Sequence, residues 1–148
     1  MATLLLDSGP VGILAHPHNP PQVVACRRWV ASLQLAGWRV ILPEIADYEI
    51  RREMLLKGSS TGIANLDWLG SQLEFLPLTT IAMRKAAEFW ATTRKRGAPT
   101  AGPNKLDGDV ILAAQAVTLG DPNAIVATSN VAHLSRFVAA EYWQNIVP

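Results

Sequence analysis

The sequence contains one cysteine, almost no net charge and no long hydrophobic run. The single Cys26 excludes an internal disulfide bond, and no basic segment precedes the first apolar run, so we expect a cytoplasmic protein without a secretion signal. The net charge of +1 excludes the positive field that many nucleic-acid-binding proteins carry over their whole surface. Any contact with nucleic acid must therefore come from local clusters of arginine and lysine.

The longest apolar stretch, residues 110–119, is interrupted by Gln115 and Thr118. It is shorter than the roughly 20 residues that a membrane-spanning helix needs, so we expect no membrane partner. The chain has 148 residues, of which 49% are hydrophobic and 17% charged, and this is enough for a core of its own. We predict a single domain over residues 1–148.

Short apolar runs alternate with segments whose apolar residues recur at helical spacing. Strands are predicted at 3–6, 38–42, 72–76 and 125–128, and helices at 22–36, from Pro43 onward, from 78 to about 95, and at 107–119. Loops are predicted at 16–21, at 58–70 with a short helical piece at 65–69, and at 98–105. Residues 135–138 and 141–146 are expected to add a strand or a helical turn. The alternation predicts an α/β fold with a parallel sheet.

Acidic residues stand near the ends of three of the apolar runs. Asp7 closes the run 3–6, Glu49 lies just beyond residues 40–42, and Asp109 precedes the run 110–114. A polar Thr128-Ser129-Asn130 follows the run 125–127. The carboxyl ends of parallel strands meet at one edge of a sheet, so these side chains are expected to converge there. Carboxylates held together repel one another and raise each other's pKa, which favours a site for Mg²⁺ or Mn²⁺.

The helix that begins at Pro43 presents its acids on different sides. At about 100° per residue, Glu49 falls on the same side as Ile45 and Leu56, which are expected to face the core. Asp47 and Met54 fall on the opposite side. An inward-facing acid is costly unless something pairs with it, so Glu49 is the acid of this helix that requires a function.

Two of the other aspartates also have structural interpretations. Asp7 can cap a turn formed by residues 8–10, and Asp107 can be the N-cap of the helix at 107–119. Asp109 projects from the first turn of that helix beside an apolar core segment, which favours a functional role.

Other chemistries have little support in the sequence. Three histidines and one cysteine do not form a zinc pattern, and His16 and His18 are expected to be exposed bystanders in a proline-rich loop. No serine-hydrolase elbow occurs, and the segment 57–62 has the composition of a phosphate-binding loop without its order of residues. Of the five tryptophans, Trp68 is the one expected to be exposed.

Four segments, in order along nearly the whole chain, resemble the PIN-domain nucleases, and among them the VapC-like toxins of bacterial toxin–antitoxin pairs. They are Leu4-Leu5-Leu6-Asp7-Ser8, Pro43-x-Ile45-x-x-x-Glu49, Asp109-Val-Ile-Leu-Ala-Ala-Gln-Ala116, and Val126-Ala-Thr-Ser-Asn130-x-x-His133-Leu. The resemblance implies a three-layer α/β/α sandwich with a mainly parallel sheet. It also implies Mg²⁺- or Mn²⁺-dependent endoribonuclease activity, a homodimer and an inhibitory antitoxin partner.

The resemblance also implies roles for individual residues. Asp7, Glu49 and Asp109 are expected to bind the metal ion, and Asn130 to complete its shell or to position the attacking water. Many members of the family have an acid where this chain has Asn130 and its neighbours, so metal affinity is expected to be lower. Ser8, Ser129, Arg51 and Arg52 are expected to contact the RNA, helped by the cluster Arg94-Lys95-Arg96.

Two alternatives share this fold. One is a non-catalytic PIN-like module that binds RNA or a protein, favoured by the uncharged Asn130. The other is a structure-specific DNA nuclease that uses the same metal site.

Overall fold

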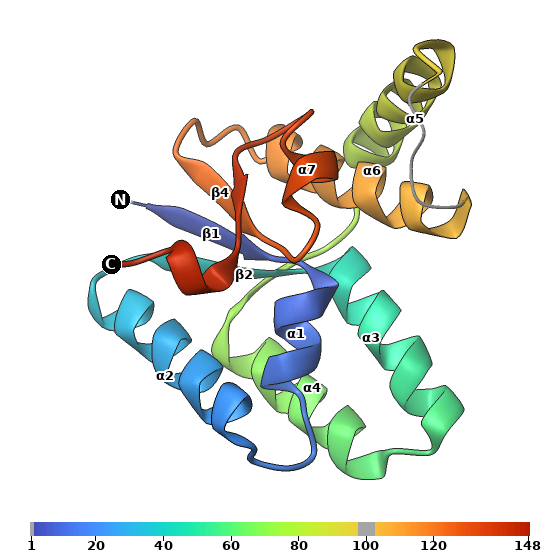
Figure 1. Cartoon of the computed structure of the whole chain (residues 1–148). Coiled ribbons are helices and arrows are strands. Elements are labelled where there is room, and N and C mark those ends of the chain that lie inside the picture. Colours follow the sequence, from blue (N-terminus) through green and yellow to red (C-terminus); the bar gives the residue numbers. More distant parts are fainter. Residues whose placement is uncertain (1, 98–102) are drawn as a thin grey trace.

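The computed structural model describes residues 2–97 and 103–148 of the chain (Figure 1). In chain order, its elements are β1 (Thr3–Leu6), α1 (Ser8–Leu14), α2 (Pro21–Leu35), β2 (Arg39–Pro43), α3 (Glu44–Lys57), α4 (Ser60–Gln72), β3 (Glu74–Leu76), α5 (Thr80–Lys95), α6 (Pro103–Thr118), β4 (Ala124–Ala127), α7 (Val131–Leu134), β5 (Ala140–Glu141) and a 3₁₀ turn, Trp143–Asn145. No helix in the described ranges is long and apolar enough to cross a bilayer.

The strands form one sheet in the order β3-β2-β1-β4-β5, and every neighbouring pair is parallel. In β1, which lies at the centre, Leu5 is in register with Ile41 of β2 and Val126 of β4. The predicted parallel α/β sheet is confirmed. The carboxyl ends of β1, β2 and β4 therefore share one edge, from which the chain continues into Asp7, α3 and Thr128.

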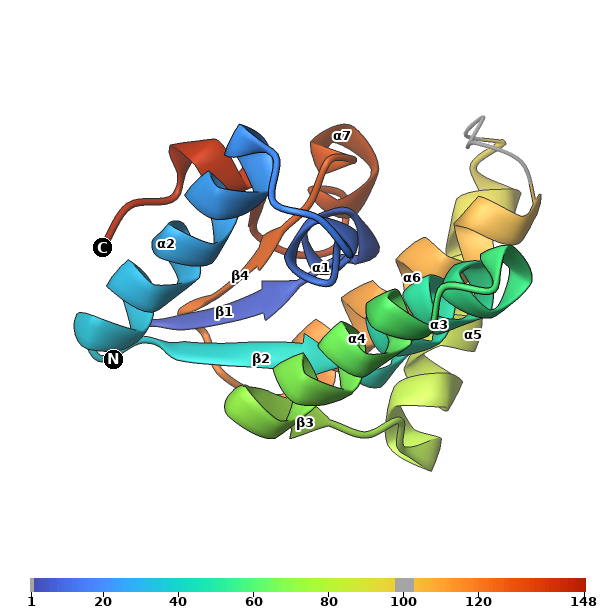
Figure 2. The ribbon, with the colours of Figure 1, turned by 90° about the horizontal axis from the view of Figure 1, so that it is seen from below.

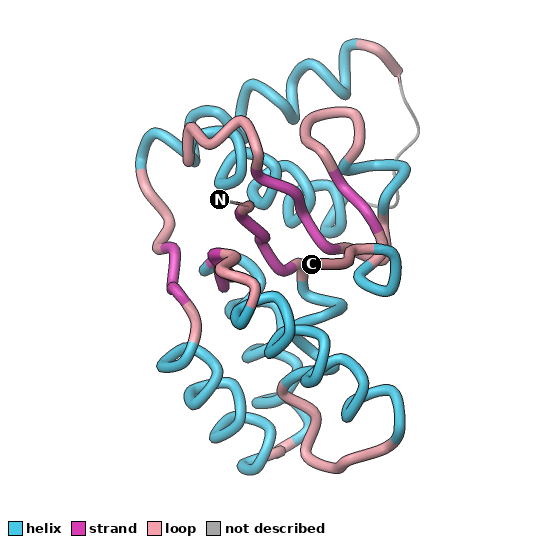
Figure 3. The backbone as a smooth tube through the Cα atoms, turned by 90° about the vertical axis from the view of Figure 1, so that its left-hand side faces the viewer, coloured by secondary structure: helices cyan, strands magenta, loops and turns pink. Residues whose placement is uncertain are grey.

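Helices cover both faces of the sheet, because successive side chains of a strand point to opposite sides. Leu4 and Leu6 pack with α1, α2 and α4 on one face, and Leu5 packs with α6 and α7 on the other. In Figure 1 the first group lies below the sheet and the second above it, with α5 packed against α6, and Figure 3 shows the strands between the two helical layers. Figure 2 shows α3 extending beyond the end of the sheet. The expected three-layer α/β/α sandwich is confirmed.

Residues 8–14 form helix α1, where the sequence predicted only a turn. The side chain of Asp7 accepts a hydrogen bond from the Ser8 backbone amide at 2.6 Å, so Asp7 is the N-cap of a helix. Pro10 lies in the first turn, where a helix tolerates proline. Val11 and Leu14 are buried, and this packing stabilises a helix that is too short to be stable alone.

Residues 60–72 form a complete helix, α4, so the loop predicted at 58–70 was wrong except for its short helical piece at 65–69. Gly58, with φ +68°, ends α3 in the left-handed conformation, and Ser59 accepts a hydrogen bond from the Gly62 amide at 3.1 Å. The polar, glycine-rich segment is thus the end of one helix and the cap of the next. Leu66 and Leu69 are buried against the sheet.

Helix α6 begins at Pro103, before the predicted start at 107. Proline is favoured in the first helical position because its missing amide has no intrahelical partner there. Asp107 lies inside this helix and is exposed, so its interpretation as an N-cap was wrong. Of the loop predicted at 98–105, residues 98–102 lie outside the described residues and residues 103–105 are helical.

The orientation predicted for α3 holds only in its first half. Ile45 is buried and the side chain of Glu49 is 20% exposed, whereas Leu56 is 89% exposed. Met54, placed by the sequence on the outer side, packs against the core beside Gly62 of α4. The reason is that α3 extends beyond the sheet, so its last turns face α4 instead.

A buried glutamine connects α6 to both neighbouring elements. The Gln115 side chain, 2% exposed, accepts a hydrogen bond from the Ile45 amide at 3.3 Å and donates one to the Leu76 carbonyl at 3.0 Å. It therefore joins α6 to the start of α3 and to the end of β3, and helps to set the position of Glu49 relative to Asp109.

We expect Gln115→Leu to lower the free energy of unfolding by about 1–3 kcal/mol, because the Ile45 amide and the Leu76 carbonyl lose their partner in a buried place. Urea denaturation followed by circular dichroism measures the change. Gln34→Leu, at an exposed position of α2, is the matched control. Equal stability of the two variants would contradict this role for Gln115.

Candidate active site

One cavity of about 400 Å³ lies at the carboxyl edge of the sheet and brings the predicted acids together. Its lining residues are Asp7, Ser8, Gly9, Glu49, Ile50, Arg52, Glu53, Asp109, Ser129 and Asn130. Asp7 comes from the end of β1, Glu49 from α3, Asp109 from α6 and Asn130 from the segment after β4. Residues more than 100 positions apart in the chain thus share one space because the strands are parallel.

Asp7 is held by hydrogen bonds to both of its carboxylate oxygens. Oδ1 accepts from the Ser8 amide at 2.6 Å, and Oδ2 accepts from the Thr128 hydroxyl, also at 2.6 Å. Thr128 is 1% exposed, and its hydroxyl oxygen accepts a hydrogen bond from the Asn130 amide at 2.8 Å. This chain of bonds ties the end of β1 to the end of β4 and fixes the orientation of the carboxylate.

Glu49 is the acid whose ionisation the site disturbs most clearly. Burial raises the pKa of its carboxyl to about 7, the Asp7 carboxylate adds to this rise, Arg52 opposes it, and Asp109 also adds. Gly108 allows Glu49 to come this close to α6, because a Cβ atom at that position would lie 2.6 Å from Glu49 Oε2. Any other residue there would push the carboxylate away.

Asp109 is half-buried, and burial, followed by the charge of Asp7, raises its pKa. Two side chains of the following segment oppose this rise. Asn130 Nδ2 donates a hydrogen bond to Asp109 Oδ2 at 2.9 Å, and His133 Nδ1 lies 3.5 Å from the same oxygen. Asn130 therefore orients Asp109 with its amide group.

The two arginines predicted to contact the substrate differ in position. Arg52 lines the cavity, and its Nη2 lies 3.9 Å from Glu49 Oε2. Arg51 instead pairs with Asp47 at 3.0 Å and with Asp67 of α4 at 2.7 Å, so it connects two helices.

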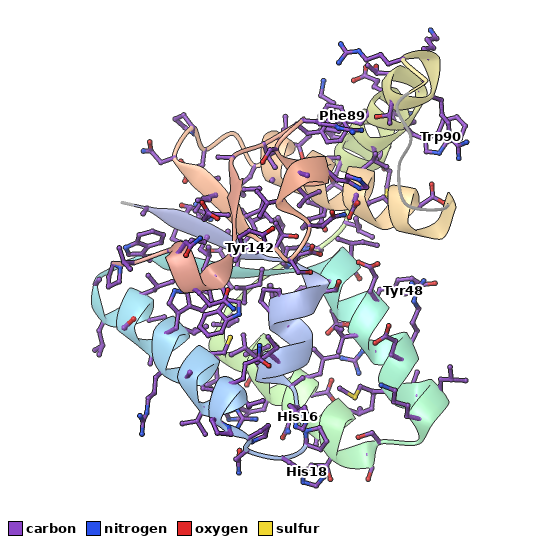
Figure 4. The ribbon with its side chains drawn as sticks, viewed as in Figure 1. His16, His18, Tyr48, Phe89, Trp90 and Tyr142 are labelled. Atoms are coloured by element: carbon purple, nitrogen blue, oxygen red, sulfur yellow. The ribbon has the colours of Figure 1, made fainter. Side chains whose placement is uncertain are left out.

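Some of the remaining residues discussed from the sequence line the cavity and others do not. Ser8 and Ser129 line the cavity, and Gly9 leaves room for the Ser129 side chain. Arg94 lies over the ring of Trp90 at the end of α5 and is not among the cavity residues. His16 and His18 lie in the loop between α1 and α2, at the bottom of Figure 4, and also do not line it. Trp68 is 64% exposed, as expected, but Trp90, which was not expected to be exposed, is also 40% exposed.

Three residues of the site received no specific role from the sequence. Glu53 also lines the cavity, and its position one turn after Glu49 was the signal that could have revealed it. The contacts of Thr128 with Asp7 and of His133 with Asp109 depend on how the chain turns after β4, which no local pattern predicts.

The donor set fits a hard divalent cation. The carboxylates are all oxygen donors. Burial, and after it the charge of Asp7, raises the pKa values of Glu49 and Asp109, and a bound cation would oppose both effects. Within residues 2–97 and 103–148, no three acidic, histidine or cysteine side chains are grouped closely enough to hold an ion by themselves. Mg²⁺ commonly uses only one or two carboxylates with water and substrate oxygens, so the cavity meets its requirements.

The sequence matches no protein-family model and no curated protein. The fold, however, is similar to solved structures over nearly its whole length. A chain of VapBC2 from Rickettsia felis, whose crystal structure holds a DNA fragment from the promoter, aligns with a TM-score of 0.70 and 16% identity, covering 95% of this chain and 98% of that one.

Two further structures agree with this result. A chain of VapBC-1 from nontypeable Haemophilus influenzae aligns with a TM-score of 0.69 and 22% identity, covering 97% of this chain and 99% of that one. A chain of FitAcB from Neisseria gonorrhoeae aligns with a TM-score of 0.65 and 21% identity, with the same coverage. The predicted resemblance to VapC-like proteins is therefore confirmed at the level of the fold, which is PIN-like.

Proposed function

We propose that this chain is a metal-dependent nuclease that hydrolyses phosphodiester bonds of RNA and acts as the toxin of a toxin–antitoxin pair. One observation carries the proposal: Asp7, Glu49 and Asp109, from three separate elements, line a single cavity at the carboxyl edge of the sheet. The likeness in fold to VapBC structures supports the same conclusion.

Mg²⁺ or Mn²⁺ would be held by Asp7, Asp109 and Glu49, with the Asn130 carbonyl as a further oxygen donor. When bound, such an ion polarises the phosphoryl group and supplies hydroxide near neutral pH. The Thr128 hydroxyl and the Ser8 backbone amide keep Asp7 in one orientation, and the side-chain amide of Asn130 does the same for Asp109. This arrangement leaves little reorganisation for the moment of reaction.

The raised pKa of Glu49 has a consequence for binding of the ion. A carboxyl whose pKa is about 7 in the metal-free protein must lose its proton to bind a cation, so binding near neutral pH would release protons. Arg52, at the rim of the cavity, is assigned to a substrate phosphate, and Ser8 and Ser129 to the neighbouring backbone. Arg51, which pairs with Asp47 and Asp67, is assigned a structural role.

The proposal includes the partners and the location. The protein would act in the cytoplasm, bind a cognate antitoxin protein and form a homodimer. Exposed apolar side chains on α5, among them Ile81, Met83 and Trp90, support an interface between chains.

A second candidate is a PIN-like module that binds RNA or a partner protein without cleaving it. The observation in its favour is that Asp7 and Asp109 already accept hydrogen bonds from Ser8, Thr128 and Asn130. Calorimetric titration with Mn²⁺ separates the two, because a module without a metal site produces no heat of binding.

We expect Asp7→Asn to abolish cleavage of a mixed RNA pool in the presence of Mn²⁺ while leaving the fold intact, because it removes one negative ligand and keeps the shape of the side chain. Gel electrophoresis of the pool measures cleavage, and a matched DNA pool tests for a DNA nuclease. Asp107→Asn, at an exposed position of α6, is the control and should remain active. Full activity of Asp7→Asn would exclude the proposed site.

We expect Glu49→Gln to stabilise the metal-free protein at pH 8 by about 1 kcal/mol, after allowance for solvent screening. The pKa of Glu49 is raised to about 7 from 4.5, so the folded protein holds this proton more tightly than the unfolded chain does. The loss of folding stability caused by the ionised Glu49 carboxylate is therefore complete above pH 7 and decreases as the pH falls toward 4.5. Thermal denaturation at pH 8 and at pH 5 measures the difference.

The same variant also tests the metal site. Mn²⁺ should raise the melting temperature of the wild type more than that of Glu49→Gln. Glu88→Gln, on the exposed face of α5, is the control and should change neither result. A stabilisation by Glu49→Gln that is equal at pH 5 and pH 8 would contradict the electrostatic explanation.

A further inference from the structure

Tyr48 and Arg52 form an exposed cation–π pair, and Arg52 of this pair lines the cavity. Tyr48 is 55% exposed, and it lies on the side of α3 that faces away from α1 (Figure 4). The Arg52 Cζ atom lies over the ring of Tyr48, 5.2 Å from its centroid. A guanidinium over the ring holds a large aromatic surface in place at the protein surface without burying it.

This pair is continuous with the acidic cavity. Tyr48 and Arg52 are one helical turn apart and so share a face of α3, and at about 100° per residue Arg52 lies between Tyr48 and Glu49 around the helix. Arg52 lines the cavity and approaches Glu49 Oε2 to 3.9 Å. An aromatic ring, a cation and a carboxylate therefore follow one another around the helix toward the cavity.

Arg52 and Arg51 differ in their ion pairs and in their exposure. Arg51 is engaged by Asp47 and Asp67, whereas the side chain of Arg52 is 51% exposed. The cavity itself carries the carboxylates of Asp7, Glu49, Glu53 and Asp109, which repel a polyanion. A cation and a stacking surface at the rim supply the attraction that the cavity alone lacks.

We propose that Tyr48, with its ring held by Arg52, forms a subsite for one unpaired base of a single-stranded nucleic acid, beside the phosphate that Arg52 is assigned to bind. This inference rests on the proposed function, and it adds a substrate-binding residue to that site. Bases stack on aromatic rings and on arginine planes with little dependence on sequence. A base inside a duplex is already stacked on its neighbours, so the subsite selects single strands.

The first test is steady-state cleavage, in Mn²⁺, of a 5′-labelled single-stranded RNA of about 12 nucleotides, chosen from those that the wild type cuts. Tyr48→Ala should raise KM about 5- to 150-fold, the equivalent of about 1–3 kcal/mol, with little change in kcat. Tyr48→Phe keeps the ring and should keep the KM of the wild type. Tyr142→Ala, which removes the only other tyrosine, 47% exposed and beyond β5, is the matched control.

A second measurement identifies the base. Copies of the RNA that lack one base at successive positions should be cut less well by the wild type at one position. For Tyr48→Ala, removing the base at that position should cause no further loss of cleavage. An unchanged KM for Tyr48→Ala would overturn the subsite. So would a result in which removing a base lowers cleavage by Tyr48→Ala as much as cleavage by the wild type at every position. Either result would leave the proposed nuclease unaffected.

A measurement of oligonucleotide binding tests the subsite even if the protein does not cleave nucleic acid. If the wild type cuts neither RNA nor DNA, fluorescence anisotropy with the same labelled oligonucleotides replaces cleavage. Weaker binding by Tyr48→Ala than by Tyr142→Ala, in RNA and DNA alike, supports the subsite in a non-catalytic module. Equal affinity of the two variants, or no binding by the wild type, overturns it.

Discussion

The organisation of this protein depends on the concentration of negative charge at one edge of its sheet. Parallel strands bring their carboxyl ends together, and here those ends lead to Asp7, Glu49 and Asp109. Such a cluster opposes folding, because burial and, after it, the charge of Asp7 disfavour the ionised forms of Glu49 and Asp109 and raise their pKa values. It is tolerated because hydrogen bonds from neutral groups hold two of the acids. The stability of the rest of the fold therefore offsets the cost of holding these carboxylates close together and partly buried.

The helices on the two faces of the sheet have different parts in this arrangement. On one face α1, α2 and α4 pack on Leu4 and Leu6, and on the other α6 packs on Leu5. Glu49 lies at the junction, on a helix that leaves the sheet edge and contacts both groups. Its position depends on Gly108, which gives it room, and on Gln115, which binds the start of α3. Substitutions of Gly108 or Gln115 in α6 are therefore expected to alter the geometry of the acids without replacing any of them.

The sequence predicted the acids of the site, the parallel sheet and most helices, because these depend on local periodicity and on where apolar runs end. It did not predict α1 or the beginning of α4, because Asp7 and Ser59 have side chains that start a helix as readily as a turn. Nor was Arg51 separated from Arg52, although Asp47, four residues before Arg51 on α3, was a local signal for one of its ion pairs. The other ion pair is with Asp67, which belongs to another helix. Contacts of this kind arise from packing and leave no mark on the local pattern.

The charge balance of the cavity links the two ligands that the proposed function requires. Four carboxylates line the cavity and Arg52 is the cation among its lining residues, so a phosphodiester meets repulsion unless a divalent ion accompanies it. In the proposed function, the substrate phosphate would in turn supply oxygen ligands to that ion. Each ligand thus strengthens the binding of the other, and by linkage the two effects are equal in free energy. In the proposed function, the uncharged Asn130 would leave the cavity less negative than an acid at that position, so more of the affinity for the ion would come from the substrate.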